Sequence, residues 1–241
     1  HQALEKGARY AVVDEPVHAN DPRCIVVKNV LTALQDLARH HRKQLTIPII
    51  GLTGSNGKTT SKELLNAVLG KKFNVFATKG NLNNHIGVPL TLLGITKSHE
   101  IAVIEMGANH QKEIELLCSI SRPTHVLITN VGKAHLEGFG GFEGVKKGKG
   151  EMYTFAKNTN ATVFINTDNE HLKEMLGGYT MIVSYGTGGS EDVSGLLKGD
   201  ASYVWLAWKT QDNDQIYNIK SHITGNYNFE NILSAIAVGI H

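Results

Sequence analysis

A short segment near residue 50 combines the residue types that bind phosphate groups. In IPIIGLTGSNGKTTSKELL, from Ile47 to Leu65, an apolar strand pattern runs into a glycine-rich turn and then into a helix that Lys58 opens. Glycine lets the backbone turn tightly and approach an anion, while N–H groups and the positive end of the helix dipole point toward it. The segment therefore predicts a P-loop that cradles the phosphates of a nucleotide.

The residues expected to touch those phosphates follow the strand directly and form the phosphate cradle: Thr53, Gly54, Ser55, Asn56, Gly57, Lys58, Thr59 and Thr60. Lys58 would reach the β and γ oxygens, and the Thr59 hydroxyl would bind Mg²⁺. The strict pattern G-x-x-x-x-G-K-[ST] is not met, because Leu52 stands at the position of its first glycine. The flanking strand and helix nevertheless favour a phosphate site over a chance glycine-rich turn.

Length and composition restrict the class of protein. The chain has 241 residues, 41% of them hydrophobic, and a formal net charge of +2. These values suit one large or two modest globular domains, and the small net charge argues against a nucleic-acid binder. Two cysteines without paired spacing indicate neither a disulfide framework nor a zinc site. With no apolar run of membrane-span length and no signal-peptide core, we expect a cytoplasmic protein without membrane insertion.

Strand-length apolar runs alternate with helix-period segments, which predicts an α/β fold with a mostly parallel, doubly wound sheet. Beyond the cradle, strands are expected at Phe73–Ala77, Ile101–Met106, His125–Asn130, Ala161–Asn166 and Met181–Tyr185. Helices are expected at Gln111–Ser119, Phe142–Phe155, Asn169–Leu176 and Asn228–Ile240. A polar, glycine-rich passage from Gly186 to Asp200 precedes two β-rich pieces, Ser202–Lys209 and Gln215–Lys220, which we expect to form an antiparallel edge hairpin.

The first forty-odd residues differ from the rest. They predict a helix at Ala3–Ala8, short strands at Tyr10–Val13 and Cys24–Val27, and a helix at Leu31–His41 whose basic tail runs into a linker. These elements have too little core to stand alone. We therefore expect residues 1–46 to be the remnant of a partial α/β N-terminal domain and residues 47–241 to be a central nucleotide-binding domain.

Four segments downstream of the cradle place polar residues at the ends of predicted strands and helices. They are GNLNNHIGVPLTLL (Gly80–Leu93), IAVIEMGANHQKEI (Ile101–Ile114), NVGKAHLEGFGGFEGVKKGKGEM (Asn130–Met152) and GNYNFENILSA (Gly225–Ala235). Together with the cradle they resemble the Mur ligases, the ATP-dependent ligases that extend the bacterial cell-wall peptide. The likeness runs from about Ile47 to the end, and the first residues resemble the tail of the family's N-terminal, UDP-binding substrate domain. It implies that a C-terminal ligase domain is absent here, so we expect this chain alone to bind nucleotide weakly and not to complete ligation.

Two side chains after predicted strands are candidate metal ligands. Glu105 ends an apolar strand at the edge where open α/β sheets bind their ligands, and a carboxylate there can hold Mg²⁺ opposite Thr59. The alternative for Glu105 is an ordinary exposed acid at a strand end. His135 follows the next predicted strand, and the resemblance implies that it binds a second Mg²⁺.

The resemblance also implies a carbamylated lysine, because in the family a lysine in a K-G-E setting reacts with CO₂ and helps to hold the second metal ion. Lys149 matches that place, with Lys147 as the alternative, and a solvated basic run is the simpler interpretation of both. The amine must be neutral part of the time, which burial or a neighbouring cation can arrange. Three glycines near Lys149 would each cost a helix about 1 kcal/mol, so tertiary contacts must hold this segment.

Asparagines supply the remaining candidate contacts. Asn81, Asn83 and Asn84 lie in a loop before a helix that Pro89 is expected to start, and the resemblance assigns this loop to the muramoyl-peptide substrate and the γ-phosphate. Asn228 and Asn231 lie one helical turn apart and match family asparagines that contact adenine. Tyr227 stands where family members usually carry histidine.

The reaction that the resemblance implies is amide formation driven by ATP. The GNLNN and EMGANH strings favour the member that joins D-alanyl-D-alanine to UDP-N-acetylmuramoyl-tripeptide through an acyl phosphate, with two Mg²⁺ ions. Lys58, His135 and Lys149 are then the expected catalytic residues, Lys58 by neutralising charge on the phosphate oxygens and the other two by holding a metal ion.

The alternatives are another Mur-type ligase, a folylpolyglutamate synthetase, or a P-loop module that only binds nucleotide. A guanine-binding switch would need an N-K-x-D string, and none occurs in the sequence. We expect a monomer that binds no nucleic acid.

Overall fold

A nine-stranded sheet forms the centre of the protein in the computed structural model, which describes residues 2–18, 20–199 and 202–241. The strand order is β11-β10-β9-β8-β7-β6-β3-β5-β4. The parallel part comprises β3 (Ile49–Thr53), β4 (Val75–Ala77), β5 (Ile101–Glu105), β6 (His125–Ile128), β7 (Thr162–Asn166), β8 (Ile182–Gly186) and β9 (Val193–Leu197). At one edge the antiparallel hairpin of β10 (Tyr203–Thr210) and β11 (Asn213–Thr224) extends the sheet, so the predicted α/β fold is confirmed.

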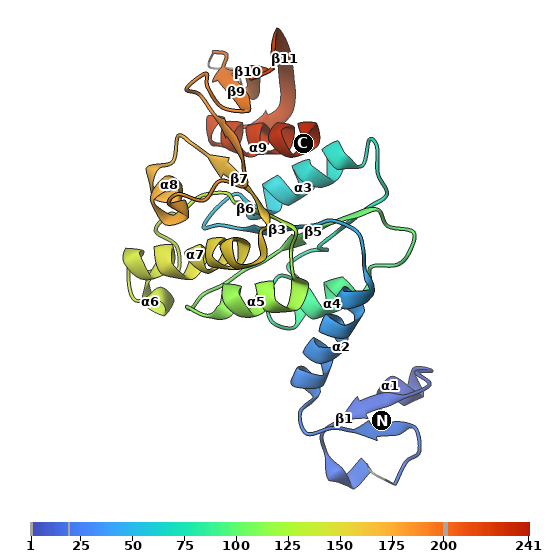
Figure 1. The fold of residues 1–241 in the computed structure, drawn as a ribbon. Helices are drawn as coiled ribbons and strands as arrows, with labels where there is room; N and C mark the ends of the chain where they lie inside the picture. The colour runs from blue at the N-terminus through green and yellow to red at the C-terminus, as the bar shows by residue number, and fades with distance from the viewer. Residues whose placement is uncertain (1, 19, 200–201) are drawn as a thin grey trace.

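Helices cover both faces of the sheet, because successive strand residues point to opposite faces. On β3, Ile49 packs into one hydrophobic core and Ile50 into the other. The core around Ile49 is covered by α4 (Gly87–Leu93), α5 (Glu113–Ser121), α7 (Phe142–Thr159) and α8 (Glu170–Leu176). The core around Ile50 is covered by α3 (Lys58–Leu69) and α9 (Phe229–Ile240), which gives the three layers visible in Figure 1. Burial on both faces explains why the strands read as continuous apolar runs.

The glycines of α7 allow a close helix contact. The short helix α6 (Leu136–Phe139) packs directly against them. A Cβ atom at Gly144 would meet the carbonyl oxygen of Phe139, and one at Gly148 would meet the Phe139 ring. This packing is the tertiary contact that the sequence required, because it compensates the poor helix propensity of glycine.

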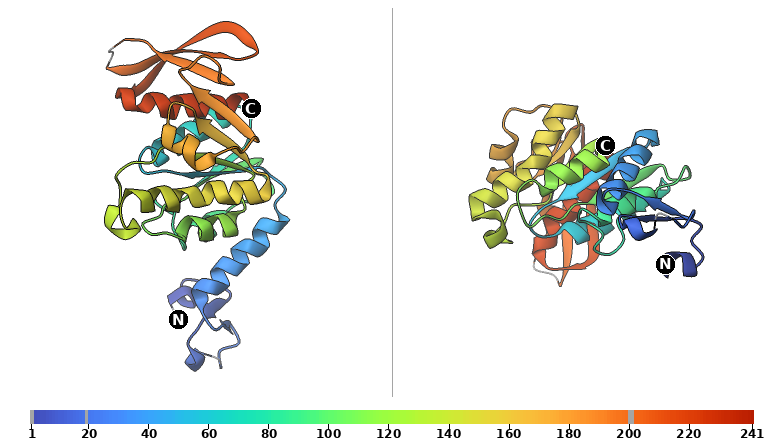
Figure 2. Two further views of the ribbon diagram at one scale, coloured as in Figure 1. Left: turned by 60° about the vertical axis from the view of Figure 1, so that its left-hand side comes forward. Right: turned by 90° about the horizontal axis from the view of Figure 1, so that it is seen from below.

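The N-terminal segment forms a small unit beside the main body. It contains α1 (Gln2–Glu5), the 3₁₀ turn η1 (Pro16–His18) and a parallel pair of strands, β1 (Ala11–Val13) and β2 (Cys24–Val26). Helix α2 (Val30–Gln44) then leads to β3, and Figure 2 shows it as a stem between the small unit and the body. Asn29 caps α2, its side-chain oxygen accepting a hydrogen bond from the Thr32 N–H at 2.8 Å.

Three local predictions were incomplete. The glycine-rich passage after Gly186 contains β9, whose Gly195 lies against Leu233 of α9 and interrupts the apolar pattern; its last residue, Asp200, lies outside the described residues. Helix α4 begins at Gly87 instead of Pro89, because proline fits the first turn, where no N–H partner is needed. Helix α6 and the 3₁₀ turn η2 (Asn226–Asn228) were not predicted. Within the described ranges, every helix is too short or too polar to cross a membrane.

Candidate nucleotide and metal site

The phosphate cradle lies in a crevice at the carboxyl edge of the sheet. Strands β3 and β6 are neighbours. After β3 the chain continues to β4 on one side of the sheet, and after β6 it continues to β7 on the other side, so a crevice opens between the loops that follow β3 and β6. Two glycines adopt backbone angles that favour glycine, with φ of 150° at Gly54 and 77° at Gly57. Gly57 is the N-cap of α3 and makes no side-chain cap, so the N–H groups of the first helical turn remain available to an anion.

Two residues after β6 hold the cradle in shape. The Asn130 side chain accepts a hydrogen bond from the Asn56 N–H at 3.0 Å and donates one to the Asn56 carbonyl at 3.1 Å. The Thr129 hydroxyl donates to the same carbonyl at 2.6 Å. Neither residue was among the predicted site residues. Their position directly after a central strand, like that of Glu105, is the sequence signal that could have found them.

Lys58 places its ammonium group inside the loop. Its Nζ atom donates to the carbonyl oxygens of Gly54 at 2.8 Å and Ser55 at 3.2 Å. Burial lowers the pKa of Lys58, while the nearby carboxylate of Glu105 opposes that shift. A desolvated cation fixed at the mouth of an N–H cradle suits an anionic ligand.

Glu105 and Thr59 lie together, as their positions in the sequence predict. The Thr59 hydroxyl donates to one oxygen of the Glu105 carboxylate at 3.3 Å, and the Asn83 amide donates to the other at 2.8 Å. Glu105 is 1% exposed, which is unlike an ordinary strand-end acid. The pair thus supplies a hydroxyl and a carboxylate oxygen, the ligand types that Mg²⁺ prefers.

Lys149 is buried beneath the same edge, whereas Lys147 is exposed. The Nζ atom of Lys149 contacts the Ala108 carbonyl at 3.4 Å and lies 5.4 Å from the centre of the Phe139 ring. Burial, assisted by the positive charge of Lys58, lowers the pKa of Lys149 to about 8. About a tenth of its amine is therefore neutral at pH 7, and carbamylation requires a neutral amine.

A cavity of about 530 Å³ is lined by all three predicted substrate asparagines and by one predicted metal residue, His135, but not by Thr59, Glu105 or Lys149. Its lining includes Lys58, Asn81, Asn83, Asn84 and His135. His135 has a left-handed backbone, with φ of 54°, immediately before α6. The sequence did not single out His85, Asn109 or Glu113, which also line this cavity.

The carboxylates of Glu113 and Glu151 accept hydrogen bonds from the loop between β5 and α5, which forms one wall of this cavity. Glu113 accepts hydrogen bonds from the N–H groups of Asn109 at 2.7 Å and His110 at 3.1 Å. Glu151, two residues after Lys149 on α7, accepts from the N–H groups of Lys112 and Glu115 at the start of α5. A carboxylate at a helix N-terminus is favoured by the helix dipole, so these contacts fix the loop that carries Ala108.

Asn228 and Asn231 lie at the start of α9, beside the cradle. The Asn228 amide donates to the Thr224 carbonyl at 2.8 Å, and its oxygen accepts from Asn231 at 2.9 Å. Asn228 and the exposed Tyr227 line a groove of about 430 Å³ beside Thr59 and Thr60. Asn231 does not line this groove and is instead turned toward α3.

The described side chains show which of the predicted metal ligands lie close enough to bind an ion. Among the described residues, no group of three or more His, Cys, Asp and Glu side chains is placed to hold a metal ion. The Thr59 and Glu105 pair fits a Mg²⁺ ion that keeps water or phosphate oxygens as its other ligands. His135 and an unmodified Lys149 do not by themselves form an ion site, because an ammonium group repels a cation.

Comparison with known proteins identifies the family. Residues 52–239 match the Mur ligase middle domain. The chain belongs to the Mur ligase family. It is 37% identical to the UDP-N-acetylmuramoyl-tripeptide--D-alanyl-D-alanine ligase of Bacillus subtilis, over 100% of this chain and 52% of that protein. The chain thus spans about half the length of the curated relatives it matches first, and the resemblance seen in the sequence is confirmed at the level of the family.

Solved structures agree with this Mur ligase assignment. MurF from Acinetobacter baumannii superimposes with a TM-score of 0.87 and 31% identity, over 99% of this chain and 52% of that one. MurF ligase from Thermotoga maritima, solved in complex with ADP, superimposes with a TM-score of 0.86 and 30% identity, over 98% of this chain and 55% of that one. These ligases share the α/β arrangement described above.

Proposed function

We propose that this chain supplies the ATP-binding and metal-binding part of a ligase that joins D-alanyl-D-alanine to UDP-N-acetylmuramoyl-tripeptide. The contact between Thr59 and Glu105 beside the phosphate cradle carries the proposal. It occurs in a chain that is similar, over all of its residues, to a protein with this ligase name. Residues 47–241 would form the ATP-binding unit, and residues 1–46 would belong to a unit that binds the UDP part of the substrate. The protein would act as a cytoplasmic monomer.

The triphosphate of ATP would lie on the cradle. The N–H groups of the first turn of α3, which no side chain caps, would bind the phosphates, and Lys58 would leave the loop carbonyls for the β and γ oxygens. The nucleoside would lie in the groove beside Tyr227 and Asn228. An exposed tyrosine ring offers a flat apolar surface for a base, in the place where family members usually carry histidine.

Thr59 and Glu105 would hold one Mg²⁺ ion, and His135 with a carbamylated Lys149 would hold the second. Bound there, the two ions would neutralise charge on the transferred phosphoryl group. Asn83 donates to Glu105, so it would keep the carboxylate facing the ion. The loop of Asn81, Asn83 and Asn84 therefore links the metal ligand to the cavity expected to receive the peptide.

Carbamylation would change the charge of Lys149 from positive to negative. The neutral amine adds to CO₂, a nitrogen–carbon bond forms, and one proton leaves to solvent. The lowered pKa of about 8 supplies the neutral amine. The resulting carboxylate would lie beside Lys58 and His135 and would remove the repulsion that an ammonium group exerts on a cation.

The reaction would proceed in two steps. The terminal carboxylate of the tripeptide attacks the γ-phosphorus of ATP, which gives an acyl phosphate and ADP. The neutral amine of D-alanyl-D-alanine then attacks the acyl carbon, the amide bond forms, the bond to phosphate breaks, and the nitrogen gives up one proton to solvent. Lys58 would stabilise the charge that develops on the phosphate oxygens in the first step.

ADP release tests this proposal. We expect the protein as the cell makes it to sustain ADP formation over many turnovers only when UDP-N-acetylmuramoyl-tripeptide, D-alanyl-D-alanine and Mg²⁺ are all present. Equal ADP formation with another amine acceptor would indicate a different Mur-type ligase or a folylpolyglutamate synthetase. A protein that binds Mg-ATP but forms no substrate-dependent ADP would be a binding module, and the proposal would be wrong.

A further inference from the structure

The side chain of Asn231 is engaged inside the protein. Its oxygen accepts a hydrogen bond from the Ser61 hydroxyl at 3.0 Å, and its nitrogen donates to the Asn228 oxygen at 2.9 Å. Asn231 is 7% exposed and Ser61 is fully buried. Both polar ends of the amide therefore have partners on the protein, one on α3 and one on the turn before α9.

The same amide also touches the phosphate cradle. A Cβ atom at Gly57 would lie 2.7 Å from the Asn231 oxygen and 3.1 Å from its nitrogen. The amide thus occupies the space that any side chain at position 57 would need. Because Gly57 is the N-cap of α3, Asn231 contacts the residue that directs the N–H groups of the first turn toward the crevice.

We infer that Asn231 is a positioning residue, which fixes the phosphate cradle against α9 instead of contacting the base. The inference rests on the proposed ATP-binding function, and it assigns Asn231 a role different from the adenine contact expected from the sequence. Asn231 holds Gly57 and Ser61 from the α9 side, while Asn130 holds Asn56 from the β6 side. Asn130, after β6, and Asn231, on α9, therefore contact the adjacent loop residues Asn56 and Gly57.

The chemistry of a buried amide explains why this contact resists displacement. If α3 moved relative to α9, the Asn231 oxygen would lose Ser61 inside a region that water does not reach, and an unpaired buried polar group is costly. The contact also links the two ends of the ligand site, because Asn228 lines the nucleoside groove and Ser61 lies on the helix that begins at the cradle. The hydrogen bonds from Ser61 to Asn231 and from Asn231 to Asn228 thus set the distance between the groove and the cradle.

Two anionic probes distinguish a positioning residue from a base contact. Mg-ATP carries the base, whereas Mg-tripolyphosphate presents only the phosphates. We expect Asn231→Ala to weaken the binding of both probes by a similar factor of about tenfold, because the cradle itself is loosened. Ser61→Ala should weaken both probes in the same direction, and the two substitutions together should cost less than the product of their separate effects. Ser121→Ala, which removes a fully buried helical hydroxyl bonded to the Leu117 carbonyl, is the matched control and should leave both affinities unchanged.

Amide hydrogen exchange gives a measure that needs no nucleotide. Exchange at the first turn of α3 should rise in Asn231→Ala and Ser61→Ala, relative to Ser121→Ala, while exchange in the strands stays the same. If the native chain bound neither probe, the ATP-binding proposal would fail, and this exchange pattern would still decide the positioning role. A loss of Mg-ATP affinity with unchanged tripolyphosphate affinity would show a base contact and overturn the inference. Unchanged exchange at the cradle would overturn it as well.

Discussion

The parallel strands begin at the amino edge of the sheet and end at its carboxyl edge. Both edges carry basic residues, but the helix ends that meet them have opposite partial charges. At the carboxyl edge, α3 begins, and its free N–H groups give the crevice a partial positive charge. At the amino edge, α2, α5 and α7 all end, and their C-caps are Leu45, Arg122 and Asn160. Helix C-termini present unpaired carbonyl groups with partial negative charge. Lys58 lies at the carboxyl edge, and Arg42 donates to helix-end carbonyls at the amino edge.

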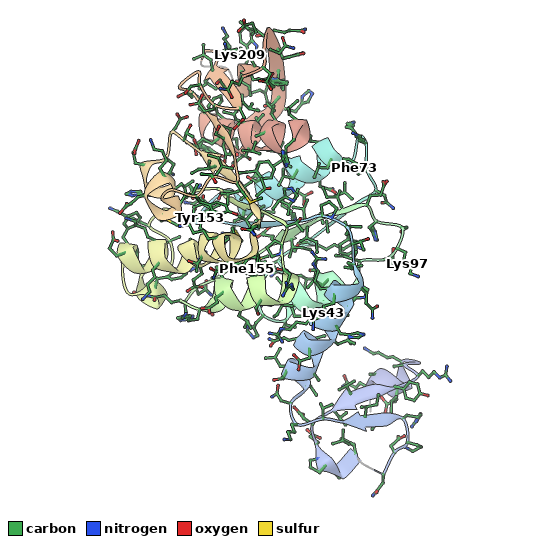
Figure 3. The ribbon with its side chains drawn as sticks, in the orientation of Figure 1. Lys43, Phe73, Lys97, Tyr153, Phe155 and Lys209 are labelled. Carbon is green, nitrogen blue, oxygen red and sulfur yellow. The ribbon has the colours of Figure 1, made fainter. Side chains whose placement is uncertain are left out.

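A basic hollow at the amino edge shows why this difference matters. Its volume of about 530 Å³ equals that of the cavity beside the cradle, and Arg42, Lys43 and Arg122 are among its lining residues. Lys43 and Phe155, which also lines it, are labelled in Figure 3. The buried Arg42 guanidinium, however, already donates to the carbonyls of Ser121, Leu45 and Arg122 at 2.8–2.9 Å. The donors of Arg42 therefore serve the carbonyl groups at helix ends and not an anion in this hollow.

Removing the cation at the carboxyl edge should strongly weaken ligand binding. We expect Lys58→Ala to weaken Mg-ATP binding by about a hundredfold, because two or more charge-assisted hydrogen bonds to phosphate are lost. Calorimetric titration of Mg-ATP into the chain measures the effect. Lys72→Ala, on the turn after α3, is the control and should bind as the native chain does. Unchanged affinity in Lys58→Ala would mean that the cradle is not a phosphate site.

Removing the cation at the amino edge should affect stability alone. Arg42→Met keeps much of the apolar stem but leaves three carbonyls without their donors, so we expect the free energy of unfolding to fall by about 3 kcal/mol. Urea denaturation measures this change. Arg39→Met on the same helix removes an exposed ion pair with Asp36 and should cost less than about 0.5 kcal/mol. A loss of Mg-ATP affinity in Arg42→Met that persisted well below its unfolding midpoint would contradict the separation of the two edges.

The carboxyl edge was largely predictable from the sequence, whereas the amino edge was not. Thr59 and Glu105 each follow or end a parallel strand, and strand ends meet at one edge of a sheet, so their proximity follows from local pattern. The sequence showed Arg42 only as part of the basic tail of a helix. Two of its three partners, Ser121 and Arg122, lie about eighty residues away, and no local pattern reveals a contact of that separation.

Asn231 illustrates the same limit within the site. Its spacing from Asn228 places both on one side of a helix, and that much was predictable. The direction of each amide depends on what packs against it, namely Ser61 and Gly57 for one and Thr224 for the other. Strand β9 escaped prediction for a related reason, since its Gly195 makes room for Leu233 from a distant helix.

The lowered pKa of Lys149 makes the carboxyl edge sensitive to pH. With a pKa of about 8, the neutral fraction of its amine rises about tenfold between pH 7 and pH 9. At constant CO₂ pressure, we expect the rate of carbamate formation to rise by the same factor. Carbon NMR of the protein in isotope-labelled CO₂ would detect the carbamate signal. Lys149→Met should lack that signal and Lys147→Met should keep it; the reverse result would move the modified position to Lys147.

A titrating group at the amino edge gives the smallest expected effect. The ring of His125 stacks on Phe164 with 6.0 Å between centroids and lies 5.5 Å from the ring of His241. Burial, with a smaller contribution from His241, lowers the pKa of His125 from 6.5 to about 4. The unfolded chain then binds a proton below pH 6.5 that the folded chain takes up only near pH 4, so stability falls as the pH drops through this window.

His125→Phe keeps a ring against Phe164 but removes this titration. Between pH 6.5 and pH 4, we expect the variant to lose about 1 kcal/mol less unfolding free energy than the native chain, a value reduced because the ring is partly solvated. Urea denaturation across this pH range measures the difference, with the exposed His171→Phe as the control. Identical acid profiles for the variant and the native chain would refute the lowered pKa. Mg-ATP affinity at neutral pH should be the same in both, since helix C-termini and a neutral imidazole at the amino edge contribute nothing to the anion site on the opposite edge.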